Sequence, residues 1–253
     1  MTLQSKHDLI FEKPILNAAG FLGFAPGFQE GIDWDALGTF ITSPISLQAR
    51  TAAAPPRLIP YPGGFLLHTG HPNPGLRSAV KQYAPQWGRS PLPILVHLLA
   101  EDPDSLRQLI EALEQVEGIM GLEIGLPPGI DKAGLSALGG AAQGELPFIL
   151  QLPLTEAAGL AREAVAAGAA AISLGPPRGA LPAPSGRLVN GRLYGPGVFP
   201  LVLDAISRLR GMEFPIIAGG GVSSNAEADA LREAGAAAVQ LDYVLWRPGG
   251  MER

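Results

Sequence analysis

Short apolar segments recur along the chain, each about the length of one buried β-strand and too short to form a helix alone. They are apolar at nearly every position rather than at every second one, which is the pattern of parallel strands covered by helices. Eight of these segments are predicted as strands: Ile15–Ala19, Thr39–Thr42, Ile94–Leu98, Gly121–Ile124, Phe148–Leu152, Ala170–Leu174, Pro215–Ala218 and Ala238–Leu241.

Segments with helical periodicity lie between several of these strands. Asp102 and Pro103 have the residue types of a helix cap and first turn, and Thr155 is the expected cap of a helix that ends before Gly168. A weaker pattern over Asp131–Leu138 predicts a short or poorly formed helix. The clearer helical predictions are Asp102–Val116, Thr155–Ala167, Pro200–Arg210 and Asn225–Ala234.

The alternation of strands and helices predicts an α/β fold, and eight repeats favour a (β/α)8 TIM barrel that forms a single domain over residues 1–253. An open, doubly wound sheet is the alternative. Two connections, residues 43–93 after the second strand and 175–201 after the sixth, are too long for simple crossovers. Because both follow the carboxyl ends of strands, where barrel enzymes assemble their sites, we expect a lid at about residues 44–75 and an elaborated sixth loop. Insertion without function is the alternative.

Composition narrows the classes of function. The chain has 18 Lys and Arg against 23 Asp and Glu, a net charge of −5, so a basic surface for nucleic acid is not expected. Cysteine is absent, which excludes disulfides, thiolate metal ligands and a cysteine nucleophile. No apolar run approaches the roughly 18 residues that span a bilayer, and the polar start of the chain lacks the pattern of a signal peptide. We expect a cytoplasmic protein with neither nucleic-acid nor membrane partners.

A glycine-rich turn, Gly219-Gly220-Gly221, follows the seventh predicted strand and precedes a helix. Such a turn lets backbone N–H groups approach an oxyanion, and barrels commonly bind phosphate in the loops after strands 7 and 8. A plain tight turn is the alternative. Asp242 ends the eighth strand, where the second half of a phosphate site is expected, and its carboxylate repels phosphate. Either no phosphate binds, or Asp242 turns outward to solvent.

A series of motifs follows in one order over nearly the whole chain: Lys13–Gly20, Thr42–Leu47 with Arg50, Pro56-Arg57, Gly70–Gly75, Arg178-Gly179, Tyr194–Pro196 with Pro200, and Gly219–Gly221. Together they resemble the dihydroorotate dehydrogenase family, FMN-dependent barrel oxidoreductases of pyrimidine biosynthesis. The resemblance implies a flavin lined by Ala18, Ala19, Gly20, Ser43, Gln151, Gly195, Gly219, Gly220 and Gly221. It implies substrate contacts by Asn73 and Glu123, and no metal.

Several residues depart from the pattern of this family. Ser43 and Gln151 stand where the family has lysines beside the flavin, and Asp242 adds a carboxylate near the expected phosphate, so these three oppose FMN binding. Leu126 stands where the family has its catalytic base, and Glu123 replaces an asparagine that holds the pyrimidine. Loss of a general base lowers a rate by about 10²–10⁴. Dihydroorotate oxidation is therefore predicted to be lost or altered, as in a pseudoenzyme.

Polar residues near the carboxyl ends of the strands provide the remaining candidates: Asn17, Ser43, His97, Glu123 and Gln151. If His97 and Glu123 face each other, they form an acid/base pair or a metal site of the carboxylate and imidazole type. The alternative is that they hydrogen-bond one another inside a silent barrel core.

The two long connections also contain basic residues that are candidates for anion binding. Arg178, Arg187 and Arg192 either bind an anionic ligand or lie in solvent, and His68 and His71 in the lid are expected to face solvent.

Three hypotheses of function follow. The first is a divergent FMN oxidoreductase of this family, with altered chemistry. The second is a non-catalytic protein that binds a small molecule at the carboxyl face of the barrel, as a homodimer or as the subunit of a partner. The third is a lyase or isomerase that uses Glu123 and His97 on a phosphorylated metabolite held at Gly219–Gly221.

Overall fold

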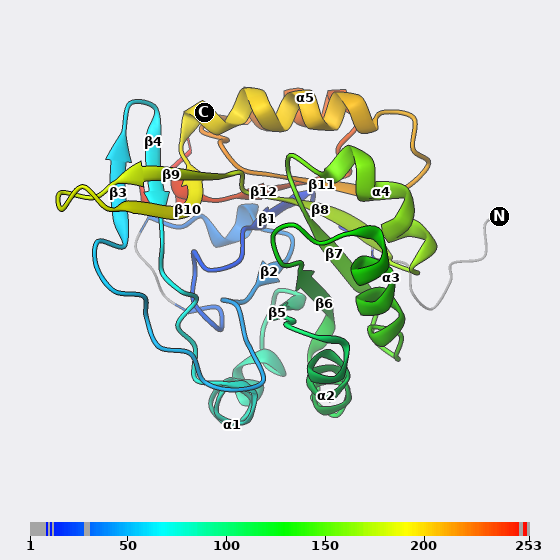
Figure 1. The fold of residues 1–253 in the computed structure, drawn as a ribbon. Coiled ribbons are helices and arrows are strands. Elements are labelled where there is room, and N and C mark those ends of the chain that lie inside the picture. Colours follow the sequence, from blue (N-terminus) through cyan, green and yellow to red (C-terminus); the bar gives the residue numbers. More distant parts are fainter. Residues whose placement is uncertain (1–8, 10, 12, 28–30, 248–249, 252–253) are drawn as a thin grey trace.

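A computed structural model describes residues 9, 11, 13–27, 31–247 and 250–251. Eight parallel strands follow the order β1-β12-β11-β8-β7-β6-β5-β2 (Figure 1). Their bounds are β1 Ile15–Asn17, β2 Phe40–Ile41, β5 Ile94–Leu99, β6 Ile119–Gly125, β7 Phe148–Pro153, β8 Ala171–Gly175, β11 Ile216–Gly219 and β12 Ala238–Leu241. A parallel bridge between Leu16 and Thr39 joins the two ends of this order. The predicted barrel is confirmed, and the open-sheet alternative is wrong.

The seam between β1 and β2 is completed by a side chain. The amide of Asn17 accepts a hydrogen bond from the Ile41 N–H at 2.9 Å and donates one to the Ile41 carbonyl at 2.7 Å. Asn17 has no exposed surface. Its amide therefore replaces the backbone ladder at a point where the strands are short, and it does not line a pocket as the sequence suggested.

Within the described residues, six helices cover the barrel: α1 Leu76–Trp87, α2 Pro103–Leu113, α3 Lys132–Ala141, α4 Ala157–Ala166, α5 Phe199–Leu209 and α6 Asn225–Ala234. Asp102 caps α2 as predicted, accepting from the N–H groups of Asp104 and Ser105. Two details were wrong: α4 begins after Glu156 rather than at a Thr155 cap, and α3 is a regular helix because Asp131 caps it. Helix α1 was not predicted. The part of the chain that the structure describes also contains three short 3-10 helices: η1 Trp34–Ala36, η2 Pro196–Val198 and η3 Tyr243–Trp246.

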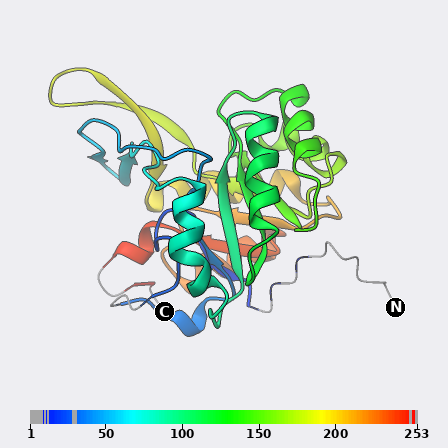
Figure 2. The same cartoon turned by 90° about the horizontal axis from the view of Figure 1, so that it is seen from below.

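The two long connections form one additional sheet. Strands β3 Leu58–Tyr61 and β4 Gly64–Leu67 come from the first connection, and β9 Arg178–Pro182 and β10 Leu188–Tyr194 come from the second. They pair antiparallel in the order β3-β4-β10-β9. This sheet stands to one side of the barrel, away from α3 and α4 (Figures 1 and 2). The expected lid and elaborated loop are thus a single structural unit.

The barrel interior is built in layers. One apolar layer contains Leu95, Ile149, Ala171, Ile217 and Ala238, all without exposed surface. Because side chains two residues apart point to the same face of a strand, the next layer toward the carboxyl ends comes from the second residue after each of these. That layer contains His97, Gln151, Ser173, Gly219 and Gln240, together with Glu123 of β6. The interior becomes polar at the end where barrels carry their sites.

Candidate functional site

Four side chains of this second layer form one hydrogen-bonded cluster, called here the polar layer: His97 of β5, Glu123 of β6, Ser173 of β8 and Gln240 of β12. His97 Nδ1 lies 2.6 Å from Glu123 Oε2, and Oε1 accepts from Ser173 Oγ and Gln240 Nε2, both at 2.7 Å. His97 and Glu123 have no exposed surface. The structure thus brings the two predicted candidates together, inside the barrel and not on its surface.

The protonation of the polar layer follows from these contacts. Burial raises the pKa of Glu123, but the hydrogen bond and charge of His97, with Ser173 and Gln240, outweigh burial and leave the pKa below its ordinary value. His97 Nε2 is buried without a hydrogen-bond partner and lies close to Gly125. In the part of the chain that the structure describes, no group of three or more His, Asp or Glu side chains is arranged to hold a metal.

The glycine-rich turn is already occupied by carboxylates of the protein itself. Asp242 is 1% exposed, and its oxygens accept from the Gly221 N–H at 3.3 Å and the Tyr243 N–H at 2.7 Å. Its alternative placement, facing solvent, is wrong. At the start of α6, Glu227 accepts from the backbone N–H and the hydroxyl of Ser223, each at 2.7 Å. Two N–H donors at this turn, those of Gly221 and Ser223, therefore already have carboxylate partners within the chain.

Burial is the main influence on Asp242. Burial raises the pKa of Asp242 to about 7, against the opposing effect of hydrogen bonds from the Tyr243 and Gly221 backbone. Near neutral pH the carboxyl is therefore divided between its acid and its ionised form.

Five of the nine residues that the resemblance assigns to the flavin enclose very little space. Ala18, Ala19, Gln151, Gly219 and Gly220 surround a cavity of about 10 Å³, which the side chains of Arg192, Tyr194, Gln240 and Asp242 also line. A volume of this size holds about one water molecule, whereas small-molecule pockets measure about 300–1,000 Å³. The space between these five residues therefore does not fit FMN.

Gly195, another predicted flavin residue, has a structural role. A Cβ on Gly195 would lie 2.5 Å from Gly64 Cα, and its φ of 121° favours glycine. It allows the end of β10 to pass against the β3–β4 turn.

A larger cavity, of about 340 Å³, opens between the mouth of the barrel and the additional sheet; we call it the arginine cavity. Arg50, Arg178 and Arg192 line it from three segments, and it is also lined by His68, His71, Phe21, Tyr194, Trp246 and the predicted residues Ala19, Gly20 and Ser43. The expectation that the two histidines face solvent is wrong, because both are half-buried in this wall. Arg187 does not line the cavity.

Sequence reasoning missed the aromatic wall of the arginine cavity. The Phe21 ring centroid lies 5.1 Å from that of Tyr194 and 4.4 Å from that of Trp246. The Trp246 indole N–H donates to the Phe21 carbonyl at 2.9 Å. No local signal marks these three residues as neighbours, since they lie in three distant parts of the chain.

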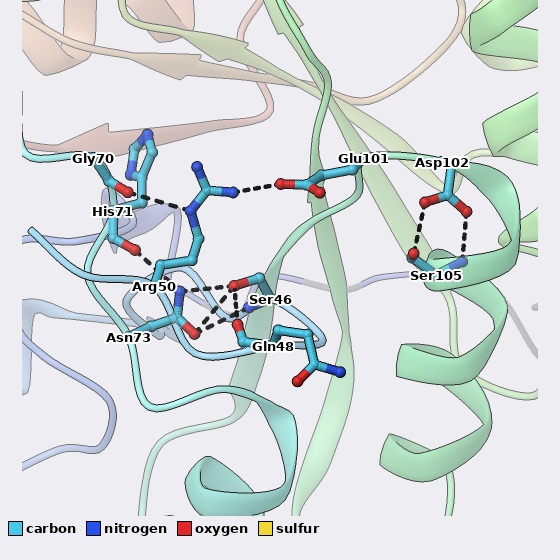
Figure 3. Close-up of polar contacts among 9 residues, drawn as sticks. All are labelled: Ser46, Gln48, Arg50, Gly70, His71, Asn73, Glu101, Asp102 and Ser105. Atoms are coloured by element: carbon cyan, nitrogen blue, oxygen red, sulfur yellow. Dashed lines mark hydrogen bonds and ion pairs between the residues drawn. The ribbon is translucent and has the colours of Figure 1, made fainter. Parts of the chain in front are cut away.

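Asn73, the predicted substrate residue, is used by the fold (Figure 3). Its Oδ1 accepts from the Gly75 N–H at 2.9 Å and the Ser46 N–H at 3.3 Å, and its Nδ2 donates to Ser46 Oγ at 2.9 Å and the His71 carbonyl at 3.0 Å. An asparagine amide has two donor hydrogens and two acceptor lone pairs, so these bonds use all of them. Asn73 therefore fixes the segment that carries His71.

A hollow of about 960 Å³ lies elsewhere, between the segment around Gln48 and helices α1 and α2. It is larger than the arginine cavity, but none of the candidate residues lines it. It sits outside the barrel mouth, so the arginine cavity is the better candidate site.

Comparisons with known proteins agree with the fold. The family model described as dihydroorotate dehydrogenase matches residues 2–150, more than half of the chain. Two relatives named dihydroorotate dehydrogenase B (NAD(+)), catalytic subunit, are each 29% identical: that of Desulforudis audaxviator over 95% of this chain and 86% of its own, and that of Maridesulfovibrio salexigens over 92% and 84%.

A solved structure gives the same result for the architecture. The dihydroorotate dehydrogenase of Eimeria tenella, crystallised in complex with ferulenol, superposes with a TM-score of 0.73, covering 92% of this chain and 76% of its own at 17% identity. Among the described residues, no helix has the length and apolar character needed to cross a bilayer.

Proposed function

The chain belongs to the dihydroorotate dehydrogenase family, and from this premise we propose that it is a member without FMN-dependent dihydroorotate oxidation, which binds a small molecule at the mouth of its barrel. The observation that carries the proposal is that five of the nine predicted flavin residues enclose a cavity of only about 10 Å³, whereas Gly20 and Ser43 line the arginine cavity instead. The departures Ser43, Gln151 and Leu126, which remove two cations and a base from the family pattern, support the same conclusion.

The Gly219–Gly221 turn supports the proposal independently. The carboxylate of Asp242 accepts from the Gly221 N–H, where a cofactor phosphate needs a donor. The ionised form of Asp242, which is populated near neutral pH, repels a phosphate in this buried setting. The same arrangement weighs against the lyase or isomerase hypothesis, since a phosphorylated metabolite meets the same carboxylate and since Glu123 and His97 have no exposed surface.

A visible absorption spectrum tests the proposal. Purified protein is mixed with excess FMN, separated from free flavin and assayed for dihydroorotate oxidation with a dye acceptor. The expected result is a colourless protein without turnover. Retention of one flavin per chain overturns the proposal and makes an altered oxidoreductase the leading function.

A variant that restores the family's residues around the predicted flavin position serves as the matched control. Ser43→Lys/Gln151→Lys/Asp242→Gly restores the two cations and removes the competing carboxylate. If this variant retains FMN and the natural protein does not, the flavin is excluded by these residues. If neither retains flavin, the three substitutions are not sufficient to admit it, and the other side chains that line the cavity, Arg192 and Tyr194 among them, are the next to test.

A role as partner subunit is the second candidate, because the relatives named above are described as catalytic subunits. Co-purification from the native host tests it. A second chain in stoichiometric amount supports this role, and a protein that elutes alone or as a homodimer counts against it.

A further inference from the structure

We propose that the arginine cavity binds a small organic anion with two or more negative charges, such as a polycarboxylate or a phosphate ester, held by Arg178 and Arg192. This inference rests on the proposed function and specifies the class of small molecule bound at the barrel mouth. The cavity has about 340 Å³, which suits a ligand of metabolite size.

The first argument is an excess of positive charge on one face of the additional sheet. Arg178 of β9 and Arg192 of β10 are directly opposite partners in the antiparallel ladder. Like charges at directly opposite positions destabilise a sheet. Among the ion pairs of the described residues, neither guanidinium has a carboxylate partner within 4.0 Å. Arg192 does hydrogen-bond to Tyr194, which is neutral and leaves the charge uncompensated.

The third arginine of the cavity, Arg50, has its charge balanced by a carboxylate of the protein. Arg50 Nη1 lies 2.6 Å from Glu101 Oε1, and Arg50 Nε donates to the Gly70 carbonyl at 3.3 Å (Figure 3). Arg50 is therefore oriented by the protein itself. The unbalanced charge belongs to Arg178 and Arg192, and a bound dianion balances it with charge-assisted hydrogen bonds.

The second argument is the preorganised segment that carries His71. His71 has a φ of 52°, and no other described residue apart from glycines has a positive φ. Thr69 Oγ1 accepts from its N–H, and Asn73 donates to its carbonyl, so this strained backbone is held from both sides. Strained backbone of this kind concentrates at ligand sites.

The surroundings of the His71 ring indicate the sign of the ligand. Burial, and after it the charges of Arg192, His97, Arg50 and Arg178 in that order, together lower the pKa of His71 to about 3. A neutral imidazole in this position donates one hydrogen bond without adding charge. An anion in the cavity opposes the arginines and raises this pKa.

The third argument concerns the carbon skeleton of the ligand. Phe21, Tyr194 and Trp246 form an apolar wall that also lines the cavity. An inorganic ion uses the arginines alone, whereas an organic anion also covers this wall. The combination favours an organic ligand over free phosphate.

Calorimetric titration with citrate and with pyrophosphate tests the inference, with acetate as a singly charged comparison. The expected result is binding of citrate, weaker binding of pyrophosphate and none of acetate. Arg178→Gln/Arg192→Gln is expected to weaken citrate binding by about tenfold or more, because each charge-assisted bond contributes at least that factor. Arg187→Gln is the matched control, since it removes one charge from the same hairpin outside the cavity, and it is expected to leave binding unchanged.

Three results overturn the inference: no binding of either probe, equal losses in the double variant and in Arg187→Gln, or binding that disappears equally for all variants with added salt. The His71 ring gives a second readout by NMR, and its pKa is expected to rise when citrate is bound.

The FMN experiment remains separate from this one. A colourless protein that binds no anion leaves the proposed function standing and removes this inference, whereas a protein that retains FMN and releases it to citrate keeps the anion site and removes the proposed function.

Discussion

Two charged regions lie within the same end of the barrel, and they are built in opposite ways. In the polar layer, Glu123 accepts hydrogen bonds or an ion pair from His97, Ser173 and Gln240, and the cluster is closed to solvent. In the arginine cavity, Arg178 and Arg192 face each other across a ladder without a carboxylate partner among the described residues.

This difference between the two regions indicates that one stabilises the fold and the other binds a ligand. Buried polar groups that satisfy one another stabilise a unique arrangement of strands, and removal of one partner leaves the others unsatisfied. Partly open like charges directly opposite one another weaken the ladder, and a bound anion offsets their repulsion. We therefore assign stability to the polar layer and ligand binding to the arginine cavity, and each prediction below tests one side of this assignment.

The largest effect is expected at Glu123. Glu123→Ala leaves His97, Ser173 and Gln240 without their shared acceptor, and we expect the free energy of unfolding to fall by about 3–5 kcal/mol. Urea denaturation measures it, with Glu117→Ala, an exposed residue of the same charge, as control. Equal small losses in both variants would show that the polar layer does not hold the barrel together.

The same residue predicts a pH dependence. The pKa of Glu123 is lowered in the folded state, so the stabilisation is present above its ordinary value of about 4.5 and is lost as the pH falls through the lower folded value. Glu123→Ala is expected to remove this component of acid unfolding.

Asp242 is expected to give a smaller effect of the opposite sign. Its folded pKa of about 7 lies above the ordinary value of 3.8, so the folded protein binds the proton more tightly and loses stability as the pH rises from about 4 to 7. Asp242→Asn keeps an oxygen for the Gly221 and Tyr243 N–H groups and removes the buried charge. We expect it to raise the free energy of unfolding by about 2 kcal/mol at pH 8 and to change little at pH 4.

Thermal unfolding across this pH range measures the Asp242 effect. Asp204→Asn is the control, because Asp204 is exposed on α5 and pairs with Arg208 at the surface. A parallel shift of both variants at every pH would assign the effect to general surface charge and not to the buried carboxyl.

The barrel itself could be predicted because its strands are apolar on both faces, which is a local signal. The contact between His97 and Glu123 could also be predicted from the sequence, because neighbouring parallel strands place equivalent positions side by side. His97 and Glu123 are register partners. The orientation of the Asp242 side chain could not be predicted from the sequence, because it depends on the backbone N–H of Gly221, which lies 21 residues away.

The additional sheet and the arginine cavity could not be predicted for a related reason. Strand β4 pairs with β10, and more than a hundred residues of the barrel separate them. The alternating exposure of β3 and the prolines and glycines of both segments are also typical of loops. Only this pairing brings together Arg50, Arg178 and Arg192 in the wall of one cavity.

Removal of the repelling charges is expected to have little effect on stability. Arg178→Gln/Arg192→Gln is predicted to raise the free energy of unfolding by up to about 1 kcal/mol at low salt, because like charges directly opposite in a ladder are unfavourable. The gain should disappear at high salt, where the charges are screened. A clear loss of stability, compared with Arg187→Gln, would mean that these arginines are structural.

The smallest effect is expected at Glu101, and it combines both sides of the comparison. The Arg50–Glu101 pair is partly exposed, so Glu101→Gln is expected to change the free energy of unfolding by less than about 0.5 kcal/mol. It also releases the Arg50 guanidinium into the arginine cavity, and citrate affinity is expected to rise by about twofold to fivefold, the equivalent of a surface ion pair. Glu117→Gln, which removes the same charge far from the cavity, should leave affinity unchanged. If Glu101→Gln weakens citrate binding instead, Glu101 holds Arg50 in the orientation that the anion requires, and the positive charge of the cavity alone does not determine binding.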